Sequence, residues 1–507
     1  MAAEISRAAK QKSIWLGDTA LLVYIALATV IVHWITGHQY GFQRDELATL
    51  EDARHLDWGF VAYPPITPLF GRLSLILFGT SLAGFRFFAA VAEAIAVVLT
   101  GLMAREMGGG RGAQLVSTAA AIPFCLAGGA MMQYVSFDYL FWVLAAYFVV
   151  KLLETEDPRW WLAIGASIGL GLESKYTMGF FAIAIAAATL LTDVRRYFKS
   201  KWLWYGVGLS ILIFLPNLIW QARNHFISLD FLQHIHGRDV RLGRAKNFLP
   251  EQLELTLGAI LLALAGLYFA LVSRDGKRFR MLGWMYLIPL ALFIMAKGRA
   301  YYLAAAYPML YAAGSVWLER MLTRAGSVAR SAVRALVWIV LISDAALMAS
   351  ITLPIAAADS PWATRAMKIN EDFREEIGWP ELVETIAKVR DALPPEDRAH
   401  FGILAGNYGE AGAVNLYGPQ YGLPAAISGV NSFWQRGYGD PPPQTLVVVG
   451  RDLDEVQDKF VSCTLAAHTW NRFGVLNEET RAHPDIFVCR TLRQPWPEYW
   501  KTARHFG

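Results

Sequence analysis

LLVYIALATVIVHWITGHQYGFQRDE, residues 21–46, begins as an apolar run and ends on a charged triplet. A helix needs about 20 mostly apolar residues to cross a bilayer, and the segment 17–36 meets that length. Arg44, Asp45 and Glu46 follow in what reads as a short exposed loop. Carboxylates at the edge of a membrane are costly unless they serve a function. The stretch therefore predicts a membrane protein with a carboxylate pair that acts at the membrane surface.

The composition of the remaining chain supports a membrane domain with a soluble domain after it. The 507 residues have a mean hydropathy of +0.34, and 17% of them are charged. Soluble domains usually carry about 25% charged residues. The deficit lies between residues 17 and 356, whereas the tail is ordinary. We expect a membrane domain over 1–356 and an α/β domain over 357–507.

Further apolar segments of near-membrane length recur throughout the first domain. No small-residue cleavage site follows the first one, so we expect it to remain as a membrane helix. Some segments are short, which favours tilted or broken helices. Together they predict an α-helical polytopic protein with about eleven spans. The candidates are 17–36, 84–104, 113–132, 137–152, 160–174, 177–192, 202–221, 253–273, 281–296, 301–318 and 334–356.

The basic residues predict how these spans are oriented. Lysines and arginines gather in alternate connections, on the same side as the basic N-terminus. The positive-inside rule makes that side cytoplasmic. The tail and the connections that hold most other polar residues are then extracytoplasmic. The basic connections contain Arg105 and Arg111, Lys151 and Arg159, residues 195–201, residues 274–280 and residues 320–334.

The tail alternates helical and strand patterns. Residues 379–393 and 453–460 have helical periodicity, while 400–405, 445–450 and 486–492 are short apolar strand candidates. This alternation predicts a small α/β domain. The net charge of +4 is modest, and no basic block with interleaved aromatics is present, so nucleic acid is not expected as a partner.

The three cysteines limit which disulfides and metal sites the chain can form. Cys125 lies in an apolar run and reads as a core residue. Cys463 and Cys489 form a disulfide if the tail lies outside the cytosol, or else two separate buried thiols. No Cys/His metal spacing occurs, and His234 and His236 lack a carboxylate at ligand spacing. No cofactor is assigned, although a divalent cation stays possible.

Basic residues on the predicted extracytoplasmic side have two interpretations. They are positioned to neutralise a phosphate, which arginine contacts through two hydrogen bonds and lysine as a point charge. Alternatively, exposed basic loops attract lipid headgroups. Lys175 favours the first interpretation because it ends a span on the side where basic residues are disfavoured. The candidates are Lys175, Arg238, Arg241, Arg244, Lys297 and Arg299.

The order of several short motifs resembles the protein O-mannosyltransferase-like (PMT-type) family of bacterial integral-membrane glycosyltransferases, the GT-C class. In that family an Asp-Glu pair follows the first span and a His-Pro-Pro triplet comes soon after it. This chain departs from the pattern in having Tyr63 where histidine is common. The motifs are Asp45-Glu46, DWG at 57–59, YPP at 63–65, FG at 78–79, Arg86, GGGR at 108–111, Asp138, ESKY at 173–176, LPNLIW at 215–220, YY at 301–302 and NYGEAG at 407–412.

The resemblance implies an inverting glycosyltransferase in the cell envelope, multi-pass in the bacterial inner membrane. Asp45 corresponds to the probable catalytic base of the family, with Glu46 and Asp138 as further catalytic candidates. The donor would be a polyprenyl-phosphate sugar and the acceptor a protein, lipid or glycan. Tyr63 and Tyr302 are candidate substrate-binding residues, and membrane lipids are expected partners.

Two alternatives stay open on the sequence alone. A transporter or flippase of lipid or sugar also has many spans, but it predicts broken helices in matching halves and polar residues at mid-membrane depth. The polar residues here gather at one predicted face. A non-catalytic scaffold that binds partners through the tail would keep its function without Asp45.

Overall fold

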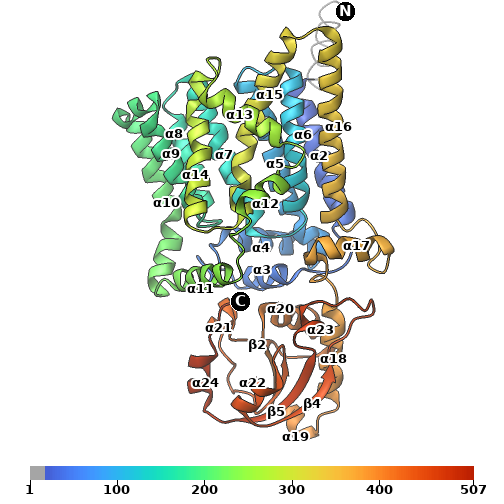
Figure 1. Cartoon of the computed structure of the whole chain (residues 1–507). Helices are drawn as coiled ribbons and strands as arrows, with labels where there is room; N and C mark the ends of the chain where they lie inside the picture. The colour runs from blue at the N-terminus through green and yellow to red at the C-terminus, as the bar shows by residue number, and fades with distance from the viewer. Residues whose placement is uncertain (1–16) are drawn as a thin grey trace, which may run out of the picture. The chain divides into compact units, whose positions relative to one another are not determined.

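The computed structural model describes residues 17–507, which form two compact units (Figure 1). The helical unit contains residues 17–35, 86–222 and 236–353 of the described chain, and the mixed unit contains residues 36–85, 223–235 and 354–507. These units differ from two consecutive domains divided at residue 356. The mixed unit contains residues 36–85 and 223–235 in addition to the tail.

Long apolar helices make up the helical unit. Many run side by side in Figure 1, and α16 packs along α6. Short 3₁₀ turns η1 (Asp193–Lys199), η2 (Lys277–Phe279) and η3 (Ala300–Ala306) join some of them. The helices are α2 (Asp18–Thr36), α5 (Leu82–Glu106), α6 (Arg111–Gly128), α7 (Tyr134–Thr155), α8 (Trp160–Leu172), α9 (Met178–Leu191), α10 (Lys201–Arg223), α12 (Phe248–Leu255), α13 (Ile260–Leu271), α14 (Arg280–Met295), α15 (Tyr307–Arg324) and α16 (Ser327–Thr352).

In the described chain, six helices are long and apolar enough to cross a membrane, or up to eight if each of two bent pairs is one span. Each of the eleven predicted spans coincides with a helix or a bent pair, but α8, with 13 residues, is short for a span. The predicted span 253–273 breaks between α12 and α13 at 104°, and α9 turns by 102° into η1.

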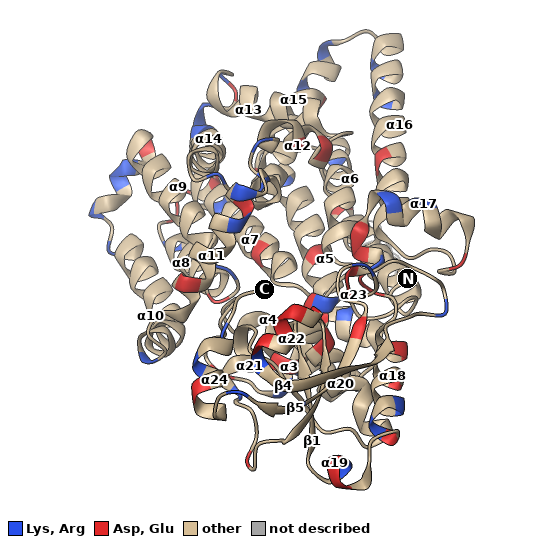
Figure 2. Ribbon diagram, turned by 60° about the horizontal axis from the view of Figure 1, so that its bottom comes forward, with Lys and Arg blue, Asp and Glu red and all other residues tan. Residues whose placement is uncertain are grey.

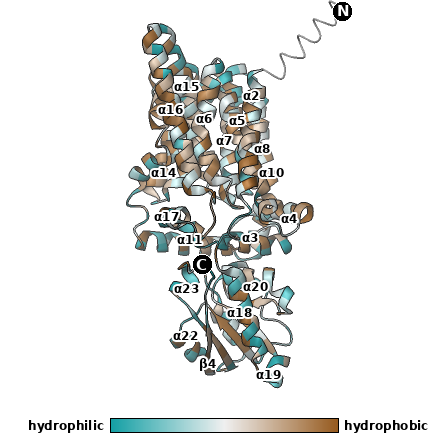
Figure 3. Ribbon diagram, turned by 90° about the vertical axis from the view of Figure 1, so that its right-hand side faces the viewer, coloured by the Kyte–Doolittle hydropathy of each residue, from teal (hydrophilic) through white to brown (hydrophobic). Residues whose placement is uncertain are grey.

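Apolar residues occupy the middle of the long helices, and charged residues lie mainly at their ends. In Figure 2 the long helices of the helical unit are mostly tan, and charged residues gather mainly at their ends and in the connections. In Figure 3, much of α16 and α10 has the brown colour of hydrophobic residues. Exposed leucines and isoleucines, such as Leu212 at 63% and Ile342 at 62%, point outward from these helices. Such surfaces suit lipid rather than water, and the protein is an integral membrane protein.

Two long segments between the predicted spans, which the sequence gives no reason to expect as helices, are in fact largely helical. The segment 37–83 contains α3 (Arg44–Arg54) and α4 (Ile66–Phe78), so the charged triplet lies at a helix start and not in an exposed loop. The segment 222–252 contains α11 (Ile227–Arg241), which runs from the mixed unit into the helical unit, and most of α12. The interpretation as loops was wrong because α3 and α11 carry many polar residues, and because the apolar helix α4 has only 13 residues, too few for a membrane span.

The tail forms a five-stranded sheet in the order β2-β1-β3-β5-β4. Strands β2, β1 and β3 are parallel, whereas β5 is antiparallel to β3 and β4. Leu446, Val448, Phe487 and Trp500 pack in one core of this unit. The strands are β1 (Phe401–Ala405), β2 (Ala426–Ile427), β3 (Thr445–Val449), β4 (Phe460–His468) and β5 (Asp485–Leu492).

Helices and short turns surround the sheet. The predicted helices at 379–393 and 453–460 correspond to α18 and α22, and three predicted strands correspond to β1, β3 and β5. The helical elements are α17 (Pro361–Ile369), η4 (Glu371–Phe373), α18 (Trp379–Asp391), α19 (Pro395–Ala399), α20 (Tyr408–Tyr417), η5 (Gly418–Tyr421), α21 (Asn431–Gln435), α22 (Leu453–Lys459), α23 (Glu478–Arg481) and α24 (Trp496–Ala503).

A disulfide joins Cys463 on β4 to Cys489 on β5. The two residues are directly paired in the antiparallel register, with Cα atoms 4.1 Å apart. The bond links the edge strand, most of whose side chains are exposed, to the buried strand β5. Cys125 is a buried free cysteine of α6, as its apolar surroundings predict.

Replacing both bonded cysteines, Cys463→Ser/Cys489→Ser, should destabilise the mixed unit. The bond closes a separation of 26 residues, and for that length the chain-entropy model gives about 3–4 kcal/mol. Thermal unfolding of the purified full chain measures the effect. Reductant should lower the midpoint of the wild type but leave that of the double variant unchanged. Two alkylatable thiols in wild type purified without reductant would contradict the bond.

Candidate active site

Helix α3 begins with a capping box that positions the carboxylate pair. The Gln43 side chain accepts from the backbone N–H of Asp45 at 2.6 Å, and the Glu46 carboxylate accepts from the Gln43 N–H at 3.0 Å. Such reciprocal bonds satisfy N–H groups at a helix start. Glu46 is fully buried, while Asp45 is half-buried. The geometry favours a structural role for Glu46 and leaves Asp45 as the more accessible acid.

Helix α20 of the tail packs closely on α3. A Cβ atom added at Gly409 would lie 2.8 Å from Cβ of Arg44, and one added at Gly412 would lie 2.7 Å from Cβ of Leu47. Only glycine permits this approach. The Tyr408 hydroxyl consequently donates a hydrogen bond of 2.7 Å to Oδ1 of Asp45. Two motifs from distant parts of the sequence thus meet in one unit.

Burial keeps the Tyr408 hydroxyl protonated, so that it donates its hydrogen bond. It raises the pKa of Tyr408 well above the ordinary value, and the neighbouring Asp45 carboxylate adds to the shift. Arg44 forms an ion pair with Glu478 and lies over the Tyr408 ring, 5.9 Å from its centroid. The Asp45 carboxylate is therefore oriented by a neutral tyrosine.

A buried carboxylate pair supports the start of α20. The Glu410 carboxylate accepts from the backbone N–H groups of Gly406 at 2.9 Å and Asn407 at 3.1 Å. The Asn407 amide donates to Glu479 at 3.3 Å. Burial raises the pKa of Glu410 to about 7 and that of Glu479 to about 8. Near neutral pH, the neutral form of Glu479 is therefore favoured.

Tyr63, a predicted substrate-binding residue, is buried and bonded elsewhere. Its hydroxyl donates to Oδ2 of Asp52 at 2.7 Å, and Arg436 of the tail forms an ion pair with the other oxygen of Asp52. Burial raises the pKa of the Tyr63 hydroxyl well above its ordinary value. This arrangement joins the end of α3 to the tail and favours a structural role for Tyr63.

In the helical unit, Lys175 lies in a cage of aromatic rings. Its Nζ is 4.2 Å from the ring centroid of Tyr302, 4.9 Å from that of Tyr301 and 4.9 Å from that of Tyr134. Ring faces attract a cation most strongly when it is poorly hydrated. Burial lowers the pKa of Lys175, while attraction to Asp138 acts in the opposite direction. The three rings and Asp138 therefore all favour a positive charge at this position.

Asp138 belongs to the first turns of α7 and is buried. Its Oδ2 accepts from the Thr177 hydroxyl at 2.9 Å and its Oδ1 accepts from the Trp142 indole at 3.0 Å. Thr177 follows Lys175 in the connection between α8 and α9. Asp138 therefore holds the connection that follows Lys175, and its carboxylate favours the charged form of that lysine.

Asp239, which sequence reasoning missed, organises the other basic candidates. Arg299 donates to both of its carboxylate oxygens, at 2.6 and 3.0 Å, and Arg244 donates to one at 3.1 Å. Asp239 is 6% exposed. Its sequence context, between Arg238 and Arg241, was the available signal. Arg299 thus forms a bidentate ion pair with Asp239. Arg241 and Lys297, in contrast, are exposed.

In the part of the chain that the structure describes, no group of three or more His, Cys, Asp or Glu side chains is arranged to hold a metal ion. Tyr408, Glu410 and Glu479 were also missing from the predicted site residues, although the NYGEAG motif at 407–412 was recognised. Asp45 and Tyr408 belong to the mixed unit, while Lys175, Asp138 and Asp239 belong to the helical unit.

Comparison with known proteins supports the resemblance. The model of the family described as dolichyl-phosphate-mannose-protein mannosyltransferase matches residues 62–220. Two Pseudomonas fluorescens proteins called undecaprenyl phosphate-alpha-4-amino-4-deoxy-L-arabinose arabinosyl transferase 1 are 27% and 26% identical over 268 residues, 48% of this chain. The aligned region covers 48% and 46% of those proteins, so the chain spans about half the length of the curated relatives it matches.

The decisive comparison is with a solved structure. ArnT from Cupriavidus metallidurans bound to undecaprenyl phosphate matches with a TM-score of 0.60 over 94% of this chain and 98% of that chain, at 15% identity. The chain has the GT-C glycosyltransferase fold. The archaeal oligosaccharyltransferase AglB from Archaeoglobus fulgidus, in complex with an inhibitory peptide and a dolichol-phosphate, matches with a TM-score of 0.52 over 85% of this chain and 69% of that chain, at 14% identity. The fold class inferred from the sequence, a polytopic GT-C protein with a small α/β region, is confirmed.

Glu479→Gln should remove a pH dependence of stability. In the folded chain Glu479 keeps its proton up to about pH 8, whereas an unfolded glutamate releases it near pH 4.3. Folding is therefore favoured at low pH, and this contribution falls as the pH rises from about 4.3 to 8. We expect Glu479→Gln to melt higher than wild type at pH 8, by about 2–4 °C for each kcal/mol gained.

The two proteins should melt alike near pH 4.5. Glu498→Gln, at an exposed position of α24, is the matched control and should leave the pH profile unchanged. A wild-type midpoint that does not fall between pH 5 and 8, or a Glu479→Gln profile parallel to it, would contradict a proton held on Glu479.

Proposed function

We propose that this protein is an inverting glycosyltransferase that moves a sugar from a polyprenyl-phosphate carrier to an acceptor. The observation that carries the proposal is the Asp45 carboxylate, presented at the start of α3 and oriented by Tyr408. A carboxylate held in this way is suited to remove a proton from the acceptor group that attacks the sugar. The GT-C fold and the named activities of the relatives support the same reaction class.

The proposed donor site centres on Lys175. As the glycosidic bond to the carrier breaks, negative charge grows on the departing phosphate. A poorly hydrated ammonium in an aromatic cage is suited to stabilise that charge. Exposed Arg241 and Lys297 would contribute long-range attraction, while Arg299 and Arg244 would act mainly through Asp239. Tyr302 would bind substrate as a wall of the cage.

We further propose that the basic ends of the helices face the cytoplasm and that the mixed unit is extracytoplasmic, in the inner membrane of a bacterium. The one-sided distribution of lysine and arginine supports this orientation, and so does the disulfide in the tail. The acceptor would be a protein, a lipid or a glycan of the cell envelope.

The transporter or flippase alternative is less favoured. Helices broken at α9–η1 and α12–α13 are present, and broken helices alone are compatible with transport. However, the relatives that match in sequence are named as transferases, and the architecture is that of GT-C glycosyltransferases. An oriented carboxylate next to a buried tyrosine also serves proton removal better than passage of a lipid.

Asp45→Asn should abolish transfer while leaving the fold and donor binding intact. Loss of a general base typically lowers the rate by about 10²–10⁴-fold. Turnover of purified protein with radiolabelled polyprenyl-phosphate sugars is the measurement, and it also reveals which sugar is consumed. Asp57→Asn, at an exposed aspartate after α3, is the control and should turn over normally. Near-wild-type turnover by Asp45→Asn would rule out its role as base.

Lys175→Ala should weaken donor binding more than acceptor binding. A charge-assisted hydrogen bond contributes about 1.5–3 kcal/mol, so we expect roughly a 10- to 100-fold loss of donor affinity. Lys175→Arg should retain part of the donor affinity. Arg334→Ala, which removes an exposed cation of α16, should retain all of it. Titration of donor phosphate against each variant decides the matter. Equal donor affinity in Lys175→Ala and wild type would remove Lys175 from the phosphate site.

A further inference from the structure

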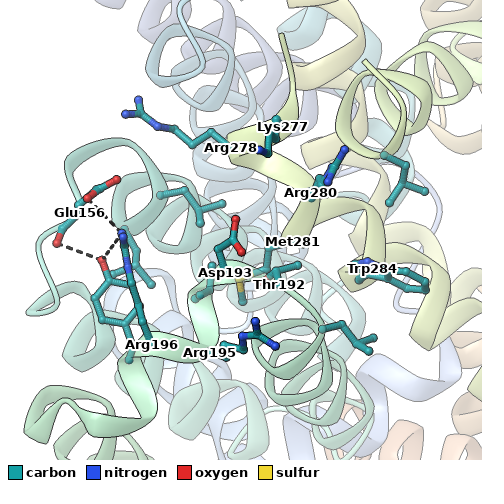
Figure 4. Close-up of a pocket in the computed structure, with 16 residues that line it drawn as sticks. Glu156, Thr192, Asp193, Arg195, Arg196, Lys277, Arg278, Arg280, Met281 and Trp284 are labelled. Carbon is teal, nitrogen blue, oxygen red and sulfur yellow. Dashed lines mark hydrogen bonds and ion pairs between the residues drawn. The ribbon is translucent and has the colours of Figure 1, made fainter. Parts of the chain in front are cut away.

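A second basic site lies at the far ends of the helices that carry the Lys175 cage. An open pocket of about 690 Å³ is lined by the ends of α7 and α9, by η1 and η2 and by the start of α14 (Figure 4). Helices α7 and α9 begin beside the Lys175 cage and end at this pocket, while α14 runs the opposite way. The 22 residues of α7 span about 33 Å. The pocket is therefore separate from the proposed donor site by the thickness of a membrane.

Cations dominate the polar side of the pocket. Five basic and two acidic side chains line it, Arg195, Arg196, Lys277, Arg278, Arg280, Glu156 and Asp193. Arg196 is paired with Glu156 at 3.1 Å, and Arg278 is paired with Glu154 at 2.8 Å. Within the described residues 17–507, Arg195, Lys277 and Arg280 have no ion-pair partner. The pocket thus keeps an excess of positive charge that an anion would neutralise.

The pocket lining also contains apolar side chains. Leu152, Leu271, Met281 and Trp284 contribute to its lining, and Leu152 and Met281 are fully buried. In Figure 4, Lys277 and Arg280 lie above Met281, Arg195 lies below it, and Trp284 lies to its right. Such a lining suits a ligand with an anionic head and an apolar body. A soluble anion would leave the apolar part without a partner.

The backbone explains why a hollow exists at this place. Helix α9 ends at Leu191, and η1 leaves it at an angle of 102°. The turn carries Arg195 and Arg196 sideways instead of extending the helix. Tyr197 anchors the turn, because its hydroxyl donates to the Glu156 carbonyl at 3.1 Å. The pocket therefore lies where the backbone turns from α9 into η1.

We propose that this pocket binds the phosphate headgroup of an anionic membrane phospholipid, with the lipid chains against its apolar lining residues. Basic pockets between membrane helices are suited to acidic lipid headgroups, and arginine binds phosphate through two parallel hydrogen bonds. The volume falls within the about 300–1,000 Å³ of ordinary ligand sites. Arg195, Lys277 and Arg280 are the ligands of the phosphate, and Trp284 lies against the glycerol and upper chains.

Native mass spectrometry of the purified full chain tests the site. The protein is taken from mixed micelles that contain either phosphatidylglycerol or phosphatidylcholine, and retained lipid is counted. Phosphatidylglycerol should be retained by wild type, and Arg195→Gln/Arg280→Gln should lower its affinity by about tenfold or more. Arg195→Lys/Arg280→Lys should keep most of the binding, and size-exclusion profiles report whether each variant is folded.

The matched control removes two cations that lie near the pocket but do not line it. Lys199→Gln/Arg274→Gln changes two exposed positions in the same connections and should retain phosphatidylglycerol as wild type does. Equal loss in both double variants would mean general surface attraction and would overturn the site, as would equal retention of phosphatidylcholine. Displacement of the lipid by millimolar glycerol phosphate would overturn the lipid assignment in favour of a soluble phosphate ligand.

Discussion

The close contact between α3 and α20 is the constraint on which the mixed unit depends. Gly409 and Gly412 let the two helix backbones approach until the Tyr408 hydroxyl reaches Asp45. A larger residue at either glycine would push α20 away and remove the hydrogen bond. The packing of small residues is thereby coupled to the orientation of one carboxylate. The buried carboxyls of Glu410 and Glu479 hold the N-terminus of α20 in place for that contact.

Electrostatics in the helical unit follows a different logic. Asp239 is buried, and Arg299 neutralises it through two hydrogen bonds. The charge of Arg299 therefore stabilises the fold and is not available to a ligand. Lys175 instead faces three aromatic rings, which stabilise a cation without carrying an opposite charge, and it is attracted by Asp138 without a direct ion pair. This difference separates cations that hold the fold from a cation that is suited to a ligand. It also explains why counting basic residues in a loop is a poor guide to a phosphate site.

The sequence predicted the fold class, the positions of the apolar helices and most of the tail elements, because apolar length and periodicity are local properties. It failed for α3 and α11, whose polar helices carry no membrane signal, and for the break between α12 and α13, which depends on packing. Asp45 was singled out through its neighbours and the family resemblance. Its partner Tyr408 was not, because a hydrogen bond between residues 363 positions apart leaves no local pattern. Asp239 was missed because the surrounding arginines drew the interpretation toward surface charge.

The composition of the mixed unit has a consequence for how the chain matures during translation. Residues 36–85 leave the ribosome early, but the helix that packs on them comes from the tail. At about 5–20 residues per second, the 363 positions between Asp45 and Tyr408 take roughly twenty seconds to a minute to synthesise. During that interval the nascent chain has its acidic helix without the partner that orients it. Synthesis of α20 is therefore required before Asp45 acquires this hydrogen bond, and a chain that stops before the tail lacks it.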